Sequence, residues 1–300
     1  MPELPEVETV RMGLEPVLVG NRFASVEQRR KDLRFPLPVN FAKRLSGRKV
    51  EALDRRAKYL LARLDDGEVL VMHLGMTGRF SIDRASHDQP PSRPVFDRST
   101  SPSRGEVREF AEHPRASPPP LRGRDRERGD QIDDANGARH RLGKFVHAQG
   151  HIPKHEHVVF HMGDGASVRY ADARRFGYMD LICESGLDEH ALFKGLGIEP
   201  LSEAFTSEWL ANRLKGKANS IKAALLDQRL IAGLGNIYAS EALYRAKISP
   251  KRLAGTVTTK SGKPTAKTET LVKSIKAVLG DAIRAGGSTL RDYARADGTL

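Results

Sequence analysis

The sequence predicts an α+β protein of two domains, with a strand-rich N-terminal part and a helical C-terminal part. Three observations support this fold class. The chain has 300 residues, and domains average about 150 residues. Apolar side chains make up 39% of it, enough to bury a sizeable core. The pattern changes from strands to helices near residue 187, and that order favours two units with a cleft between them.

The N-terminal part opens with a helix and continues as strands. Apolar residues at helical spacing predict a helix from Pro5 to about Val19, ended by Gly20. Alternating or continuous apolar runs around tight turns then predict two strand pairs: residues 59–64 with 69–74, and residues 158–162 with 167–170.

Residues 84–142 have a different composition. They hold eight of the 17 prolines, and their few apolar residues show no period. Such a segment buries too little surface to offset its ordering entropy, so we expect a disordered insertion. We favour an inert spacer, and the alternative is that its arginines touch DNA loosely.

Helical spacing dominates from Leu187 onward. The apolar pattern predicts four helices: residues 202–214, 220–226, 237–246 and 271–285. Gly286 and Gly287 end the last one, and Gly233 and Gly235 interrupt the pattern before the third.

The charge balance predicts a polyanionic partner. Lysine and arginine total 50 against 38 acids, a formal net charge of +12. Nucleic acid is the leading candidate and an anionic membrane surface the weaker one. One cysteine, Cys183, excludes an internal disulfide framework and a thiolate-clustered zinc site within these residues. We see no signal peptide and no membrane-spanning run, so a cytoplasmic protein is expected.

The first residues could carry chemistry. A small second residue normally permits removal of Met1, which would expose the secondary amine of Pro2. An α-amino group titrates near ~8, so it can attack a carbonyl at neutral pH. Glu3 and Glu6 could serve as general acid or base beside it, and a helix dipole would favour their ionised forms. Many chains begin with Met-Pro, however, and Glu6 also suits an ordinary first helical turn.

A glycine-rich segment offers a second candidate site. Residues 226–238 read LDQRLIAGLGNIY, with Asn236 at the start of a predicted helix. Backbone N–H groups at such a terminus suit a DNA phosphate, although helix capping would also explain the glycines and the asparagine.

Six sequence blocks together resemble the bacterial formamidopyrimidine-DNA glycosylase family. They are PELPEVET at 2–9, RRAKYLL at 55–61, HLGMTGRF at 73–80, KHEHVVF at 154–160, RRFG at 174–177 and LLDQRLIAGLGNIYASEAL at 225–243. They occur in the family's order. The resemblance implies a two-layer β-sandwich with an opening helix at 1–185, a linker at 186–200 and a helix-two-turn-helix DNA-binding domain at 201–300.

By that resemblance, Pro2 is the Schiff-base nucleophile, Glu3 the proton donor, and Lys58 a proton donor for β-elimination. A lysine in a basic strand is otherwise a solvated surface charge. Met76, Arg174 and Phe176 match the residues that fill the void left by an extruded nucleotide, a role that suits a thioether, a guanidinium and an aromatic ring.

Further matches lie along the expected DNA path. His73, His155, Arg175 and Asn236 match positions near the DNA backbone, although His73 could equally be a packed strand histidine. Residues 290–293, ending at Tyr293, fall where the family's lesion-recognition loop begins.

Three departures from the family stand out. The family ends in a zinc-bound hairpin with four cysteine ligands, whereas this chain stops at Leu300 before such a module, so we expect a truncated product without metal. The insertion at 84–142 is the second departure. Ala173 replaces the usual proline before RRFG, which should loosen that loop.

The expected function is base-excision repair of damaged double-stranded DNA by a monomer. The resemblance implies a bifunctional glycosylase and AP lyase that removes formamidopyrimidines and 8-oxoguanine and cuts by β,δ-elimination. The alternatives are an endonuclease VIII-like enzyme acting on oxidised pyrimidines and a non-catalytic DNA-binding remnant.

Overall fold

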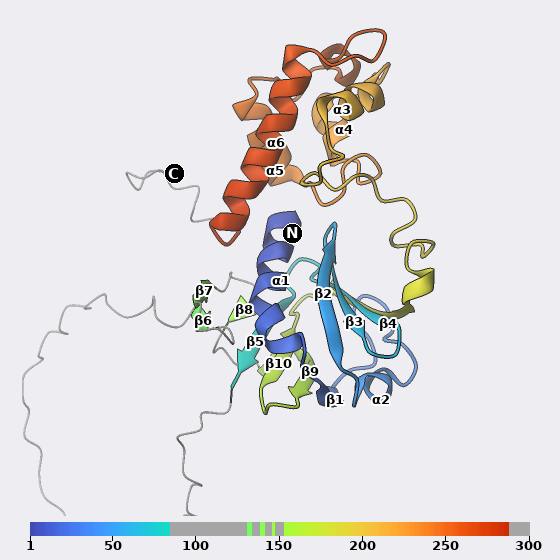
Figure 1. The fold of residues 1–300 in the computed structure, drawn as a ribbon, viewed down its shortest axis with the longest axis vertical. Helices are drawn as coiled ribbons and strands as arrows, with labels where there is room; N and C mark the ends of the chain where they lie inside the picture. The colour runs from blue at the N-terminus through green and yellow to red at the C-terminus, as the bar shows by residue number, and fades with distance from the viewer. Residues whose placement is uncertain (85–130, 134–138, 142–145, 148–152, 288–300) are drawn as a thin grey trace, which may run out of the picture.

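A computed structural model of the chain describes residues 1–84, 131–133, 139–141, 146–147 and 153–287. Two β-sheets and a long helix form the lower half of Figure 1, and a helical bundle forms the upper half. Tyr293 and most of the segment 84–142 lie outside the described residues.

Helix α1 (Leu4–Leu18) fulfils the first expectation to within one residue. Glu3 is its N-cap and forms a capping box with Glu6, while Pro5 occupies the first turn. The helix ends before Gly20, whose φ of 81° needs a residue without a β-carbon. Its apolar face, including Val10 and Leu14, is fully buried in the sandwich core.

The sandwich consists of two sheets. One has the strand order β11-β4-β3-β2 and the other the order β1-β9-β10-β5-β8. The bounds are β1 Phe23–Gln28, β2 Val50–Arg56, β3 Tyr59–Leu64, β4 Glu68–His73, β5 Arg79–Asp83, β8 Val146–His147, β9 Glu156–Met162, β10 Ser167–Ala171 and β11 Tyr178–Cys183. Pairs β3–β4 and β9–β10 are the two predicted antiparallel pairs. Both are confirmed.

The insertion is not structureless throughout. Strands β6 (Gln131–Asp133) and β7 (Arg139–Arg141) pair antiparallel inside the segment expected to be disordered. That expectation is therefore wrong for these residues. Strand β7 also lies beside α1, a contact between distant segments that the composition of the insertion does not reveal.

The helical part consists of α3 (Ser207–Leu214), α4 (Ile221–Leu226), α5 (Asn236–Arg245) and α6 (Ala266–Arg284), with its own apolar core. Short helices elsewhere are α2 (Phe41–Leu45), η1 (Pro153–His155), η2 (Glu184–Gly186) and η3 (Ala254–Val257). Two predicted starts were wrong. Helix α3 begins five residues later than predicted because the Thr206 side chain caps it, and α6 begins five residues earlier because Thr265 caps it.

The start of α1 docks directly against the helical part (Figure 1). The Leu4 N–H donates to the carbonyl oxygen of Gly233 over 3.1 Å. The connecting segment packs Leu187 and Phe193 against the outer face of the β3–β4 sheet. Among the helices in the described ranges, none has the length and apolarity that crossing a bilayer needs.

Candidate active site at the domain junction

Pro2 and Glu3 lie at the start of α1, where the two parts of the molecule meet. Pro2 is buried, while Met1 is 59% exposed. The Glu3 side chain turns into the helical part, and only 4% of the residue is exposed. Its Oε2 accepts the Gly235 N–H over 2.8 Å, and its Oε1 accepts the Ile237 N–H over 2.9 Å.

The same helix start was predicted to bind a DNA phosphate. In the structure, the Glu3 side chain accepts the backbone N–H groups of Gly235, Ile237 and Tyr238 there. Two glycines make this approach possible. A β-carbon on Gly235 would lie 2.3 Å from Glu3 Cδ, and one on Gly233 would lie 3.0 Å from Leu4. Asn236 is exposed beside this contact.

The environment of Glu3 shifts the pKa of its carboxyl. Burial raises the pKa of its carboxyl above the usual range, and this outweighs the lowering by the Ile237 N–H and by the charge of Lys58. Backbone N–H groups at the α5 start do lower this pKa, as expected of a helix terminus, but desolvation is the larger effect. A carboxyl group with a raised pKa is better suited to act as a general acid than an ordinary glutamate.

Glu6 connects the same two segments. Its Oε2 accepts the Glu3 N–H over 2.8 Å, and its Oε1 accepts the hydroxyl of Tyr238 on α5. The residue is 5% exposed. Capping of α1 therefore explains Glu6 as the ordinary interpretation predicted, and the Tyr238 contact adds a link that the sequence did not suggest.

Lys58 approaches this acidic pair from the turn between β2 and β3. It is 8% exposed, which excludes the interpretation as a solvated surface charge. Burial lowers the pKa of its ammonium, while the nearby charges of Glu3 and Glu6 oppose the change. The fold thus gathers three buried groups from two distant segments: a nucleophile candidate, an acid and a lysine.

His73 lies at the end of β4, close to Lys58. Its Nδ1 accepts the Gly75 N–H over 3.0 Å, and its ring packs 4.9 Å from that of Tyr59. Burial, assisted by the positive charges of Lys58 and Arg34, lowers the pKa of His73 to about 4. The imidazole is therefore neutral at pH 7, with its proton on Nε2.

Met76, Arg174 and Phe176 lie together on two adjoining loops. Met76 is 40% exposed and Phe176 41%. The Arg174 guanidinium carbon lies 4.8 Å from the centre of the Phe176 ring. A β-carbon on Gly75 would lie 2.3 Å from the Phe176 carbonyl carbon, so the loops touch. Their exposure is unlike that of core residues.

A buried aspartate that sequence reasoning missed joins these loops. Asp172 is 0% exposed. Its Oδ1 accepts the hydroxyl of Thr77 and the N–H of Arg174, and its Oδ2 accepts the Gly177 N–H over 2.7 Å. An aspartate directly after a buried strand and before a glycine-containing turn was the available signal. It also anchors the loop at Ala173, where the usual proline is missing.

The remaining predicted residues lie nearer the surface. His155 is half-buried, and its carbonyl accepts the Asp172 N–H over 3.0 Å. Arg175 is exposed, with its Nη1 3.6 Å from Asp32 Oδ1. Within the described ranges, no group of three or more histidine, cysteine or acidic side chains is placed to hold a metal ion.

Sequence comparisons match both parts of the chain to one family. Residues 1–112 match the Formamidopyrimidine-DNA glycosylase N-terminal domain, and residues 196–294 match the Formamidopyrimidine-DNA glycosylase H2TH domain. The formamidopyrimidine-DNA glycosylase of Beijerinckia indica is 49% identical over 300 residues, which covers 100% of this chain and 85% of that protein. The one from Chelativorans is 46% identical over 304 residues with the same coverages.

Solved structures give the same result. A mutant of the Lactococcus lactis enzyme, in complex with a Fapy-dG-containing DNA, aligns with a TM-score of 0.64 and 28% identity, covering 99% of this chain and 84% of that one. The wild-type L. lactis enzyme with an oxidized pyrimidine-containing DNA aligns at 0.65 and 28%, covering 96% and 82%. The chain therefore belongs to the formamidopyrimidine-DNA glycosylase family, and it is a base-excision DNA glycosylase.

Proposed function

We propose that this chain excises oxidised purines from double-stranded DNA and then cuts the strand as an AP lyase, acting as a monomer. The observation that carries the proposal is the burial of Pro2, Glu3 and Lys58 at one junction. Each group by itself has an ordinary structural explanation. Their convergence gives an amine, a carboxyl whose pKa is raised by burial, and a lysine in one desolvated place.

The proposed chemistry starts at Pro2 once Met1 has been removed. The secondary amine attacks C1′ of the damaged nucleotide, and the base departs with the proton that the amine gives up. Glu3 then supplies a proton to the ring oxygen as the C1′–O4′ bond breaks and the sugar ring opens. The product is a cationic iminium, which makes the C2′ proton acidic. Loss of the C2′ proton to water expels the 3′ phosphate by β-elimination, with Lys58 as the proton donor to the departing phosphate. Loss of the C4′ proton to water then expels the 5′ phosphate by δ-elimination.

The exposed residues are proposed to hold the DNA. Met76 and Phe176 would wedge into the stack, and Arg174 would pair with the orphaned cytosine. Backbone contacts are assigned to His155, Arg175 and Asn236. His73 is a further candidate because its neutral ring keeps a donor at Nε2.

The domain division remains part of the proposal. We place the catalytic sandwich at 1–185, the linker at 186–200 and the DNA-binding helical domain at 201–300, with Tyr293 in the lesion-recognition loop. A location with the bacterial nucleoid in the cytoplasm follows from the proposed substrate.

The family's zinc site does not fit these residues. Four cysteine ligands are needed, and the 300 residues contain only Cys183. The proposed mechanism uses no cofactor, and none of its steps passes through a metal ion.

Borohydride trapping on lesion-containing duplex tests the proposal. Two preparations of the same chain are compared, one starting at Pro2 and one retaining Met1, with each N-terminus confirmed by mass spectrometry. We expect a covalent DNA complex only with the first, because Met1 converts the amine into an amide. Equal trapping of both would overturn the role of Pro2. Binding to DNA without trapping of either would favour the non-catalytic remnant.

The lesion class needs a second measurement. The L. lactis complexes contain both a formamidopyrimidine and an oxidised pyrimidine, so pyrimidines are the nearest alternative substrates. Single-turnover excision should be faster on duplexes with formamidopyrimidine or 8-oxoguanine than on matched duplexes with an oxidised pyrimidine. The reverse order would assign the chain to the pyrimidine class.

A further inference from the structure

The turn that carries Lys58 has an unusual backbone. It joins β2 to β3 through only two residues, and the first, Ala57, has a φ of 53°. Residues with a β-carbon seldom adopt this left-handed conformation, which persists where surrounding contacts enforce it. The position of Lys58 therefore depends on whatever holds Ala57.

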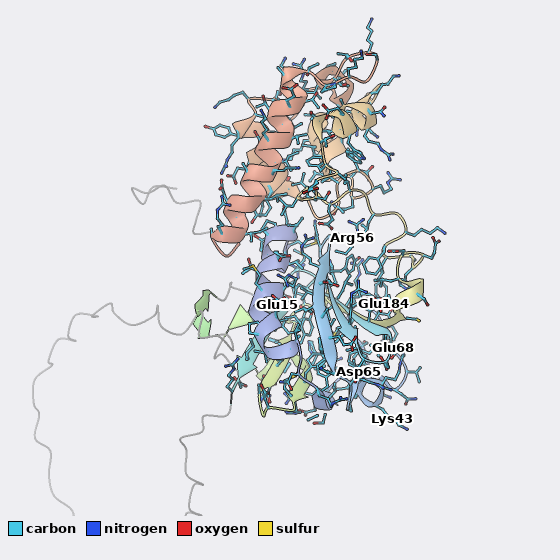
Figure 2. All side chains as sticks on the ribbon, viewed as in Figure 1. Glu15, Lys43, Arg56, Asp65, Glu68 and Glu184 are labelled. Atoms are coloured by element: carbon cyan, nitrogen blue, oxygen red, sulfur yellow. The ribbon has the colours of Figure 1, made fainter. Side chains whose placement is uncertain are left out.

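Glu199 provides those contacts from the linker, 142 residues further along the chain. Its Oε1 accepts the Ala57 backbone N–H over 2.6 Å. The same carboxylate accepts Arg55 Nη1 over 2.8 Å at Oε2 and Arg56 Nη1 over 3.0 Å at Oε1. Three donors on consecutive residues thus converge on one side chain. Figure 2 shows Arg56 at the end of β2 that faces the helical domain.

Arg55 and Arg56 complete the enclosure of the turn. Arg55 Nη1 also donates to the Ala57 carbonyl oxygen over 3.0 Å, so both backbone groups of Ala57 are fixed. Arg56 Nη2 donates to the carbonyl oxygen of Gly197 over 2.8 Å, which ties the turn to the linker a second time.

The linker is in turn fixed to the segment that holds Glu3. The Ile198 N–H donates to the Leu230 carbonyl oxygen over 3.1 Å, and the Ala232 N–H donates to the Ile198 carbonyl oxygen over 2.9 Å. Gly233 and Gly235, which contact Leu4 and Glu3, follow directly. A short series of backbone contacts therefore connects the Lys58 turn with the acid.

We propose that Glu199 is a positioning residue that sets the Lys58 turn relative to Pro2 and Glu3. The inference rests on the function proposed for Lys58. An ordinary exposed ion pair contributes little and could be lost without consequence. Glu199 differs because one of its three partners is the backbone of a left-handed residue next to the lysine.

A mutant cycle separates this role from a general structural one. Single-turnover rates of excision and elimination, and the DNA Kd, are measured for wild type, Glu199→Ala, Lys58→Ala and the double variant. We expect Glu199→Ala to slow the Lys58-dependent step on the order of 10- to 100-fold, the penalty typical of a misplaced catalytic group. The Kd should change less than about twofold, because DNA contacts are untouched. In the Lys58→Ala background, Glu199→Ala should add no further loss.

Two further variants keep the test independent of folding. Glu199→Gln retains an acceptor for the Ala57 N–H and should lose less rate than Glu199→Ala. Glu184→Ala breaks the exposed ion pair between Glu184 and Arg63, which lies on β3 away from the Lys58 turn, and this variant should behave as wild type. If Glu199→Ala does not fold, the cycle is repeated with Glu199→Gln.

The pH profile adds a readout that a purely structural role would leave unchanged. Burial lowers the pKa of Lys58. In Glu199→Ala, the loosened turn should admit water and raise that pKa, so the alkaline limb of the elimination rate plotted against pH should move to higher pH. Additive losses in the cycle, or a change in Kd alone, would overturn the inference about Glu199. A Lys58→Ala variant with wild-type rates would instead overturn the proposed function of Lys58.

Discussion

Two sites position their side chains in different ways: the buried junction of Pro2, Glu3 and Lys58, and the two exposed loops that carry Met76 and Phe176. At the junction, the carboxylate that accepts backbone N–H groups is Glu3, which is itself the proposed acid. At the loops, the accepting carboxylate is Asp172, and it lies beneath the side chains that would meet DNA. One residue therefore serves both the proposed chemistry and the local structure at the first site, whereas different residues serve them at the second.

The largest expected effect comes from Glu3. Glu3→Gln keeps an acceptor for the Gly235 or Ile237 N–H but cannot supply the proton. Excision should slow by about 10²- to 10⁴-fold, the range typical of a lost general acid. Single-turnover kinetics on lesion duplex measure it, and Glu15→Gln on the exposed face of α1 (Figure 2) is the control. Excision within about threefold of wild type would contradict the role of Glu3.

Asp172→Ala should destabilise the two exposed loops by removing the buried carboxylate that anchors them. The substitution leaves the Gly177 N–H, the Arg174 N–H and the Thr77 hydroxyl without their acceptor. We expect the free energy of unfolding to fall by about 3 kcal/mol, since buried unsatisfied donors are costly. Urea unfolding measures this, with the exposed Asp188→Ala as control. Equal midpoints for the two variants would refute the anchoring role.

Phe176→Ala tests whether a side chain on the exposed loops contributes to DNA binding and not to the stability of the fold. Because the ring is 41% exposed, the free energy of unfolding should change by less than about 0.5 kcal/mol. The Kd for lesion duplex should nevertheless rise about tenfold, because a stacked aromatic contributes about 1 to 3 kcal/mol per base. Fluorescence anisotropy with lesion and undamaged duplexes checks it. A loss of stability with unchanged affinity would place Phe176 with the core.

The smallest effect concerns pH and His73. The pKa of His73 is about 4 in the folded chain and 6.5 in the unfolded chain. Between these two pH values, the unfolded state therefore binds one proton more than the folded state. Stability is then lost as the pH falls from 6.5 toward 4. Wild type should lose about 1 kcal/mol more than His73→Gln between about pH 7.5 and 5.5. Urea unfolding at both pH values measures the difference, and parallel losses would mean that His73 titrates normally.

Local patterns explain which features the sequence could predict. The α1 helix and the two confirmed strand pairs are encoded by spacing within a few residues, so their bounds were nearly right. The burial of Lys58 and the partners of Glu3 depend on contacts between segments far apart in the chain, 142 residues for Ala57 with Glu199 and 232 for Glu3 with Gly235, which no local pattern records. Gly235 illustrates the limit. Its presence was noticed, but the close approach of the Glu3 side chain that requires a glycine there was not.

The 232 residues between Glu3 and Gly235 have a consequence for biosynthesis. A ribosome adds about 5 to 20 residues per second, so roughly 10 to 50 seconds pass between the emergence of the amine and that of the backbone that orients its acid. During that interval, the proposed nucleophile exists without the backbone donors that hold the proposed acid. On the proposed mechanism, strand cutting therefore requires that synthesis of the chain has passed α5.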